Sequence, residues 1–129
     1  MALNVLIVDD SKVMRSMVLK TMKMAQIPLG DVVQAGNGQE GLDALAENWI
    51  DLVLVDINMP VMNGEEMIRQ MKSKPETAGI PVVVISTEGS ETRIFRLKEL
   101  GAAFVHKPFT PEEIRDTISA LTGIGGDDA

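Results

Sequence analysis

The chain of 129 residues is long enough for one domain with a sizeable core, and its 45% hydrophobic and 24% charged residues are ordinary for a globular protein. It contains no cysteine, which excludes disulfides, thiolate catalysis and cysteine-based metal sites, and its single histidine argues against a multi-histidine metal site. The net charge of −7, with 12 basic residues dispersed along the chain, argues against a surface that binds nucleic acid directly.

The N-terminal segment does not have the pattern of a signal peptide. Its apolar run is short, lacks a basic flank and becomes acidic at Asp9. No stretch approaches the ~20 apolar residues that a membrane span requires. We therefore expect a cytoplasmic protein that is not inserted in a membrane.

Short apolar runs alternate with helical stripes along the chain. Strands are predicted at residues 3–8, 32–35, 52–55, 82–85 and 102–106, each followed by a helix. The helices are predicted from a cap at Asp10 or Ser11 to about residue 25, and at residues 39–48, 65–73, 90–100 and 111–121, with residues 75–81 as a connection. This alternation predicts an α/β fold, a doubly wound five-stranded parallel sheet with helices on both faces.

Most apolar residues on the helical stripes are interpreted as core. The stripes include most of the methionines, among them Met14, Met17, Met67 and Met71. Trp49, before the central strand, is also interpreted as a packing residue.

Polar residues follow four of the predicted strands. Asp9 and Asp10 follow the first, Asp56 follows the central one, and Ser86 and Lys107 follow the last two. The carboxyl ends of parallel strands share one edge, where open α/β sheets place their chemistry. We therefore expect these five side chains to converge.

Three carboxylates at one edge would repel each other, and a bound divalent cation removes this conflict. Oxygen-only ligation suits Mg²⁺, and the backbone carbonyl of Asn58, two residues beyond Asp56, is placed to add a ligand. Taken singly, the aspartates could be turn formers or helix caps, the serine a cap, and the lysine a solvated surface charge. Their occurrence together at one edge favours a site.

Several segments around these residues form a recognisable series. They are VDDSKVMR at residues 8–15, VDINMP at 55–60 with NG at 63–64, VISTE at 84–88, and GA at 101–102 with KPF at 107–109. In this order they resemble the receiver domain of two-component response regulators, over residues 3 to about 122, and in particular the stand-alone, chemotaxis-type (CheY-like) receivers. The resemblance implies a flavodoxin-like fold with strand order 2-1-3-4-5. It also implies a receiver domain at residues 1–122, followed by a flexible tail at 123–129 without an output domain.

The resemblance assigns a role to each residue at the edge. Asp56 is expected to accept a phosphoryl group from a histidine kinase. Asp10 and Asp56 are expected to bind Mg²⁺ through their side chains, Asn58 through its carbonyl, and Asp9 directly or through water. Lys107 is expected to pair with the Asp56 carboxylate and then with the phosphoryl group.

Ser86 and Phe104 are expected to carry the signal away from the site. Ser86 would hydrogen-bond a phosphoryl oxygen, and Phe104 would turn into the space that this movement vacates. The face formed by residues 90–100, 102–106 and 111–121 would then change. The bond between Lys107 and Pro108 is expected to be cis. The protein is expected to be a switch that catalyses only its own phosphorylation and dephosphorylation.

The resemblance implies a sensor histidine kinase (CheA-like) or a histidine phosphotransfer protein as the phosphoryl donor. A flagellar motor switch or a phosphatase could be a further partner, in chemotaxis or a phosphorelay. Two other functions stay open, a Mg²⁺-dependent phosphohydrolase with Asp56 as nucleophile and a phosphorylation-independent binding module. The first is disfavoured because residues 56–58 lack the second aspartate of haloacid-dehalogenase phosphatases.

Some positions depart from the family pattern or have a second interpretation. Phe104 stands where the family often has tyrosine, so a hydroxyl contact to a partner is absent. Thr87 stands where a smaller residue is frequent, which narrows access to the phospho-acceptor. His106 is interpreted as a surface strand residue rather than a phosphotransfer site. Met59 and Met62 are interpreted as core filling, with a partner surface as the alternative.

Overall fold

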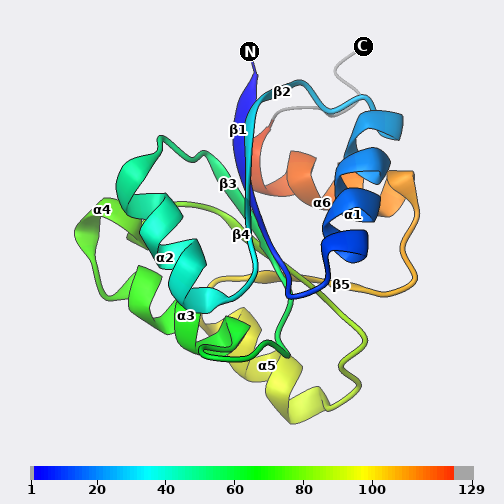
Figure 1. Ribbon diagram of the computed structural model, residues 1–129. Coiled ribbons are helices and arrows are strands. Elements are labelled where there is room, and N and C mark those ends of the chain that lie inside the picture. Colours follow the sequence, from blue (N-terminus) through cyan, green and yellow to red (C-terminus); the bar gives the residue numbers. More distant parts are fainter. Residues whose placement is uncertain (1, 124–129) are drawn as a thin grey trace.

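The structure is a computed structural model that describes residues 2–123, and the elements below refer to this part of the chain (Figure 1). The strands are β1 (Leu3–Val8), β2 (Leu29–Ala35), β3 (Leu52–Val55), β4 (Val82–Ser86) and β5 (Ala103–His106). The helices are α1 (Lys12–Met24), α2 (Gly38–Glu47), α3 (Gly64–Lys72), α4 (Pro75–Ala78), α5 (Glu91–Glu99) and α6 (Pro111–Thr122). The predicted tail lies outside the described residues from residue 124 on.

The strands form one parallel sheet in the order β2-β1-β3-β4-β5, which confirms the predicted fold class and strand order. Helices α1 and α6 lie on one face of this sheet, and α2, α3 and α5 lie on the other (Figure 1). The central position of β3 places the residue that follows it, Asp56, in the middle of the carboxyl edge.

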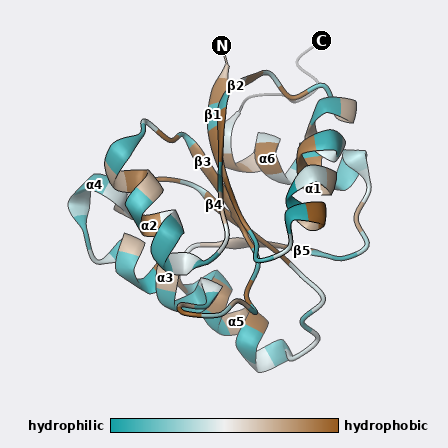
Figure 2. Cartoon of the chain, viewed as in Figure 1, coloured by the Kyte–Doolittle hydropathy of each residue, from teal (hydrophilic) through white to brown (hydrophobic). Residues whose placement is uncertain are grey.

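Both faces of the central strand are buried, which explains its uninterrupted apolar run. Leu52 and Leu54 belong to the core under α1 and α6, whereas Val53 and Val55 belong to the core under α2, α3 and α5. This alternation follows from the two-residue period of a strand. Figure 2 shows the same arrangement, with hydrophobic residues along the central strands.

Two side chains that we expected in the core are exposed. Trp49 is 81% exposed, and its indole N–H donates to a carboxylate oxygen of Asp51 at 3.1 Å, while the next residue, Ile50, is buried instead. Met17 is 52% exposed because Val18, its neighbour on α1, faces the sheet, and successive helical residues point about 100° apart. Both predictions were wrong.

The predicted connection at residues 75–81 contains a further short helix, α4. Pro75 is in the first turn of α4, where backbone N–H groups have no partner within the helix. The missing N–H of proline therefore costs no hydrogen bond there. The first helix is capped by Ser11 rather than Asp10, because the Ser11 hydroxyl accepts the N–H of Met14. Within residues 2–123, no helix has the length and apolar character that crossing a membrane would require.

Candidate functional site

The register of the sheet brings the predicted site residues to one edge. Val8 of β1 pairs with Val55 of β3, and the N–H of Asp56 donates to the carbonyl oxygen of Val8 at 3.0 Å. Asp9 and Asp56 therefore follow the ends of adjacent strands at neighbouring positions of the register. On the other side of β3, Ser86 ends β4, and the N–H of Lys107 donates to the carbonyl oxygen of Ser86 at 3.0 Å.

Three carboxylates and one ammonium group meet at this edge. Carboxylate oxygens of Asp9, Asp10 and Asp56 lie within 4.8 Å of one another. The Lys107 ammonium lies 3.5 Å from Asp9 Oδ2 and 3.6 Å from Asp56 Oδ2. One positive charge thus faces three carboxylates, and the site has an excess of negative charge.

Asp9 is the most buried member of this group, with 5% of its surface exposed. Burial raises the pKa of its carboxyl group, although the hydrogen bond from the Ser11 N–H and the charge of Lys107 act in the opposite direction. The nearby Asp56 charge raises the pKa further. The folded protein therefore disfavours the charged form of Asp9.

The backbone around Asp56 fixes its carboxylate. Its Oδ1 accepts the N–H of Ile57 at 2.8 Å, and the loop that follows returns so that the Gly64 N–H donates to the Ile57 carbonyl oxygen at 2.9 Å. Gly64 lies so close to the Asp56 carbonyl oxygen that any Cβ at this position would collide with it. A glycine is therefore required where α3 begins, and it ties this helix to the backbone of Asp56.

The donor set of the acidic cluster fits a hard divalent cation. Asp9, Asp10 and Asp56 offer only oxygen atoms, and Asp10 is exposed, so that ligand sites remain open to water. Asn58 lies in the loop after Asp56 and is also exposed. A cation would neutralise the excess negative charge, which makes the residues present compatible with Mg²⁺.

The two residues expected to carry the signal lie on the strands that follow β3 in the sheet, with Ser86 at the end of β4 and Phe104 on β5. Ser86 is completely buried, and its hydroxyl accepts the N–H of Glu88 at 3.1 Å. Phe104 is half-buried against the core under α3 and α5, and its ring packs edge-on against His106 with the centroids 4.6 Å apart. His106 is exposed, as expected, and the bond between Lys107 and its following proline is cis, as expected.

The remaining residues of interest near the site have simpler surroundings. Thr87 is exposed at the start of the loop between β4 and α5. Met59 and Met62 are half-buried and pack against the core under α3 and α5, in agreement with core filling.

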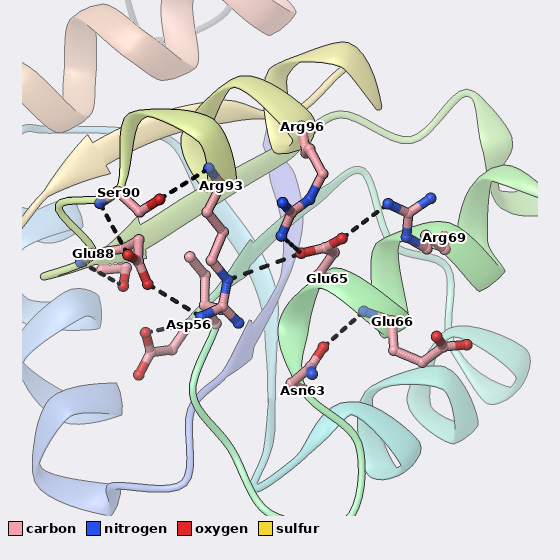
Figure 3. Close-up of polar contacts among 11 residues, drawn as sticks. Asp56, Asn63, Glu65, Glu66, Arg69, Glu88, Ser90, Arg93 and Arg96 are labelled. Atoms are coloured by element: carbon pink, nitrogen blue, oxygen red, sulfur yellow. Dashed lines mark hydrogen bonds and ion pairs between the residues drawn. The ribbon is translucent and has the colours of Figure 1, made fainter.

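Sequence reasoning missed a cluster of charged residues next to the site, shown in Figure 3. Glu65, in the first turn of α3, pairs with Arg69 at 2.9 Å, with Arg96 of α5 at 3.4 Å and with Arg93 of α5 at 3.9 Å. Arg93 also pairs with Glu88 at 3.2 Å. Only the spacing of Glu65 and Arg69, four residues apart on a helix, gave a signal in the sequence.

Comparisons with known proteins agree with this geometry. A family model described as the response regulator receiver domain matches residues 5–119. The chain is 29% identical over 125 residues to a chemotaxis protein CheY homolog of Campylobacter jejuni, covering 95% of each chain. It is 31% identical over 123 residues to the chemotaxis protein CheY1 of Helicobacter pylori, covering 94% of this chain and 98% of the relative. The solved structure of CheY4 of Vibrio cholerae is similar, with a TM-score of 0.81 and 31% identity, covering 94% of this chain and 99% of that one. These matches confirm the resemblance inferred from the motifs.

Proposed function

We propose that this chain, which belongs to the response regulator receiver domain family, is a phosphorylation-controlled switch with Asp56 as the phospho-acceptor. Receiver domains are signalling switches rather than enzymes that turn over an external substrate, and they work with a histidine kinase or a phosphotransfer protein. The observation that carries the proposal is the placement of the Asp56 carboxylate 3.6 Å from the Lys107 ammonium and beside two further aspartates.

The chemistry follows from this placement. A carboxylate oxygen of Asp56 attacks the phosphorus atom of a phosphohistidine on the partner, and the P–N bond breaks with its electron pair going to the imidazole. Such transfers depend mainly on positioning and charge neutralisation. The Lys107 ammonium faces the transferred group, and the hydrogen bond from Ile57 fixes the carboxylate.

Receiver domains bind Mg²⁺ at an acidic pocket, and we propose Asp9, Asp10, Asp56 and the carbonyl of Asn58 as its ligands here. A bound Mg²⁺ would supply further positive charge beside the phosphoryl oxygens. Water later cleaves the acyl phosphate, which restores the Asp56 carboxylate and releases phosphate. The protein thus catalyses its own phosphorylation and dephosphorylation and no other reaction.

The phosphoryl group would be sensed by Ser86 and Phe104. The buried Ser86 hydroxyl would turn to donate to a phosphoryl oxygen, and the half-buried Phe104 ring would move further inward. The face formed by α5, β5 and α6 would change as a result. This is a population shift, because the phosphoryl group contacts one arrangement better than the other.

The partners are proposed from the family and the relatives. A CheA-like sensor kinase or a histidine phosphotransfer protein would donate the phosphoryl group. The names of the CheY relatives support a role in chemotaxis, with a flagellar motor switch or a phosphatase as further partner, and a phosphorelay is the alternative pathway. We place the protein in the cytoplasm because these proposed partners act there. We also propose that the receiver domain spans residues 1–122, of which the family model matches residues 5–119.

The test is to incubate the protein with Mg²⁺ and acetyl phosphate and to locate the incorporated phosphoryl group. Label on Asp56 is expected, with loss in Asp56→Asn and retention in Asp43→Asn, the same change at an exposed position on α2. Undiminished labelling of Asp56→Asn would falsify the assignment. Multiple turnover on a small phosphomonoester would instead favour the phosphohydrolase, and no labelling would favour a phosphorylation-independent binding module.

A further inference from the structure

Arg93, in the first turn of α5, lies between two carboxylates that belong to different parts of the molecule (Figure 3). Its Nη1 donates to Glu88 Oε1 at 3.2 Å, and its Nε lies 3.9 Å from Glu65 Oε1. The side chain is only 27% exposed, and those of Glu88 and Glu65 are 16% and 15% exposed. The guanidinium is thus held from both sides in a poorly solvated position, where an ion pair is screened less than at an open surface.

Glu88 is the residue through which Arg93 reaches the site. The Glu88 N–H donates to the Ser86 hydroxyl at 3.1 Å, and Glu88 Oε2 accepts the N–H of Ser90 at 3.0 Å. With the bond from Arg93, the loop at residues 87–90 is fixed at three points. The Ser86 oxygen is therefore linked to this loop, and a displacement of the oxygen has to be accommodated by the Glu88 N–H.

Glu65 anchors Arg93 on the other side. Its carboxylate also accepts hydrogen bonds from Arg69 and Arg96, and the bond from Arg69 holds the pKa of Glu65 below its usual range despite partial burial. Glu65 follows Gly64, which packs against the backbone of Asp56. The anchor therefore stands on a helix whose first residue packs against the backbone of Asp56.

We propose that Arg93 is a positioning residue that holds the loop at residues 87–90, and with it Ser86, in the unphosphorylated arrangement. This inference rests on the proposed function. Arg93 links two parts of the structure. One is the loop at residues 87–90, which has to move on phosphorylation, and the other is helix α3, which packs against the backbone of Asp56. The resting state is favoured by the Arg93–Glu88 hydrogen bond, and phosphorylation has to overcome it. Loss of Arg93 therefore lowers the free energy needed to reach the phosphorylated arrangement.

The experiment titrates the protein with beryllofluoride in the presence of Mg²⁺, because this complex mimics a phosphoryl group on an aspartate. Binding is followed by the NMR signals of the amides at residues 87–90. In Arg93→Gln the beryllofluoride concentration at half-saturation is expected to fall about two- to fivefold, the range for partly exposed ion pairs. The loop amides of the free variant should also shift toward their positions in the bound parent protein.

The matched control is Arg96→Gln, on the same helix and paired with the same Glu65, but without a contact to Glu88. Its half-saturation is expected to equal that of the parent. Glu88→Gln removes the charge from the other end of the same contact and should reproduce the effect, and the double variant should add nothing further. Glu88→Gln also serves as the test if Arg93→Gln does not fold.

The outcomes separate the two proposals. If the parent does not bind beryllofluoride at all, the proposed function fails and this inference fails with it. If the parent binds and Arg93→Gln has the same or a higher half-saturation than Arg96→Gln, only the role of Arg93 is refuted. Equal effects of all three single variants would likewise refute it, because general destabilisation would then explain the change.

Discussion

Replacing Asp9 by asparagine is expected to stabilise the protein when no divalent cation is present. Asp9 is buried, and the pKa of its carboxyl group is raised, first of all by that burial. A carboxyl group with a raised pKa in the folded state destabilises the fold when it is charged. Asparagine is neutral at every pH and keeps an oxygen that can accept the N–H of Ser11.

The magnitude follows from the charges around Asp9. At an effective dielectric constant of 20, two carboxylates no more than 4.8 Å apart repel by at least about 3.5 kcal/mol. The Lys107 ammonium at 3.5 Å attracts Asp9 by about 4.7 kcal/mol in the same medium. Asp10 and Asp56 both lie within this distance of Asp9, so the attraction to Lys107 does not exceed the summed repulsion, and the cost of burying the charge adds to the destabilisation. We expect Asp9→Asn to raise the free energy of unfolding by on the order of 1 kcal/mol.

The assay is urea unfolding at neutral pH, in EDTA and again in excess Mg²⁺. In EDTA the midpoint should rise without a change in slope. With Mg²⁺ the parent should gain about 2.7 kcal/mol when the free ion is 100-fold above its dissociation constant, and the variant should gain clearly less. Asp43→Asn, the same change at an exposed position on α2 outside the acidic cluster, is the control, and its effect in EDTA should stay within about 0.5 kcal/mol.

Two results would refute this reasoning. If Asp9→Asn is less stable than the parent in EDTA, the attraction to Lys107 outweighs burial and repulsion together. If Mg²⁺ stabilises the parent and the variant equally, Asp9 has no part in holding the ion.

Three further predictions test other parts of the structure. Arg69 holds the pKa of Glu65 below its ordinary value of 4.5. The stabilisation from this carboxylate is therefore present above pH 4.5, and it is lost as the pH falls through the pKa of the folded state. The difference in unfolding free energy between the parent and Glu65→Gln should therefore shrink on acidification below pH 4.5, and a constant difference would contradict this. Val61, a β-branched residue with a φ of 67° and 83% exposure, should be replaceable by asparagine with a gain of about 1 kcal/mol in urea unfolding. Gly64→Ala should cost about 1–3 kcal/mol and weaken beryllofluoride binding, because its Cβ meets the Asp56 carbonyl oxygen, whereas Gly79→Ala, with open space around it, should do neither.

The fold could be predicted because the central strands β1, β3 and β4 are apolar on both faces. A run such as residues 52–55 is buried against helices on either side, and a parallel sheet is the arrangement that requires this. The placement of Asp9, Asp56, Ser86 and Lys107 at one edge then follows from topology alone, because each residue ends or follows a strand. Their roles remain predictions.

What the sequence could not indicate depends on tertiary packing. The contact between Glu65 and Arg96 joins residues 31 apart, and it exists only because α5 packs beside the start of α3. Trp49 failed as a core residue for a similar reason. Its size favours burial, but the connection before β3 turns Ile50 inward and leaves the indole to bond with the carboxylate of Asp51.

Under the proposed function, two contacts near Ser86 would favour the unphosphorylated arrangement. On one side its hydroxyl accepts the N–H of Glu88, which Arg93 holds in place. On the other side it pairs with His106 across the sheet, and the His106 ring packs against that of Phe104. Under the proposed function, inward movement of Phe104 would change this ring contact, and a contact between aromatic rings is worth about 0.5–1.5 kcal/mol. The free energy that the phosphoryl group must supply is therefore divided between the two neighbours of Ser86, so releasing either one alone should shift the resting population only part of the way.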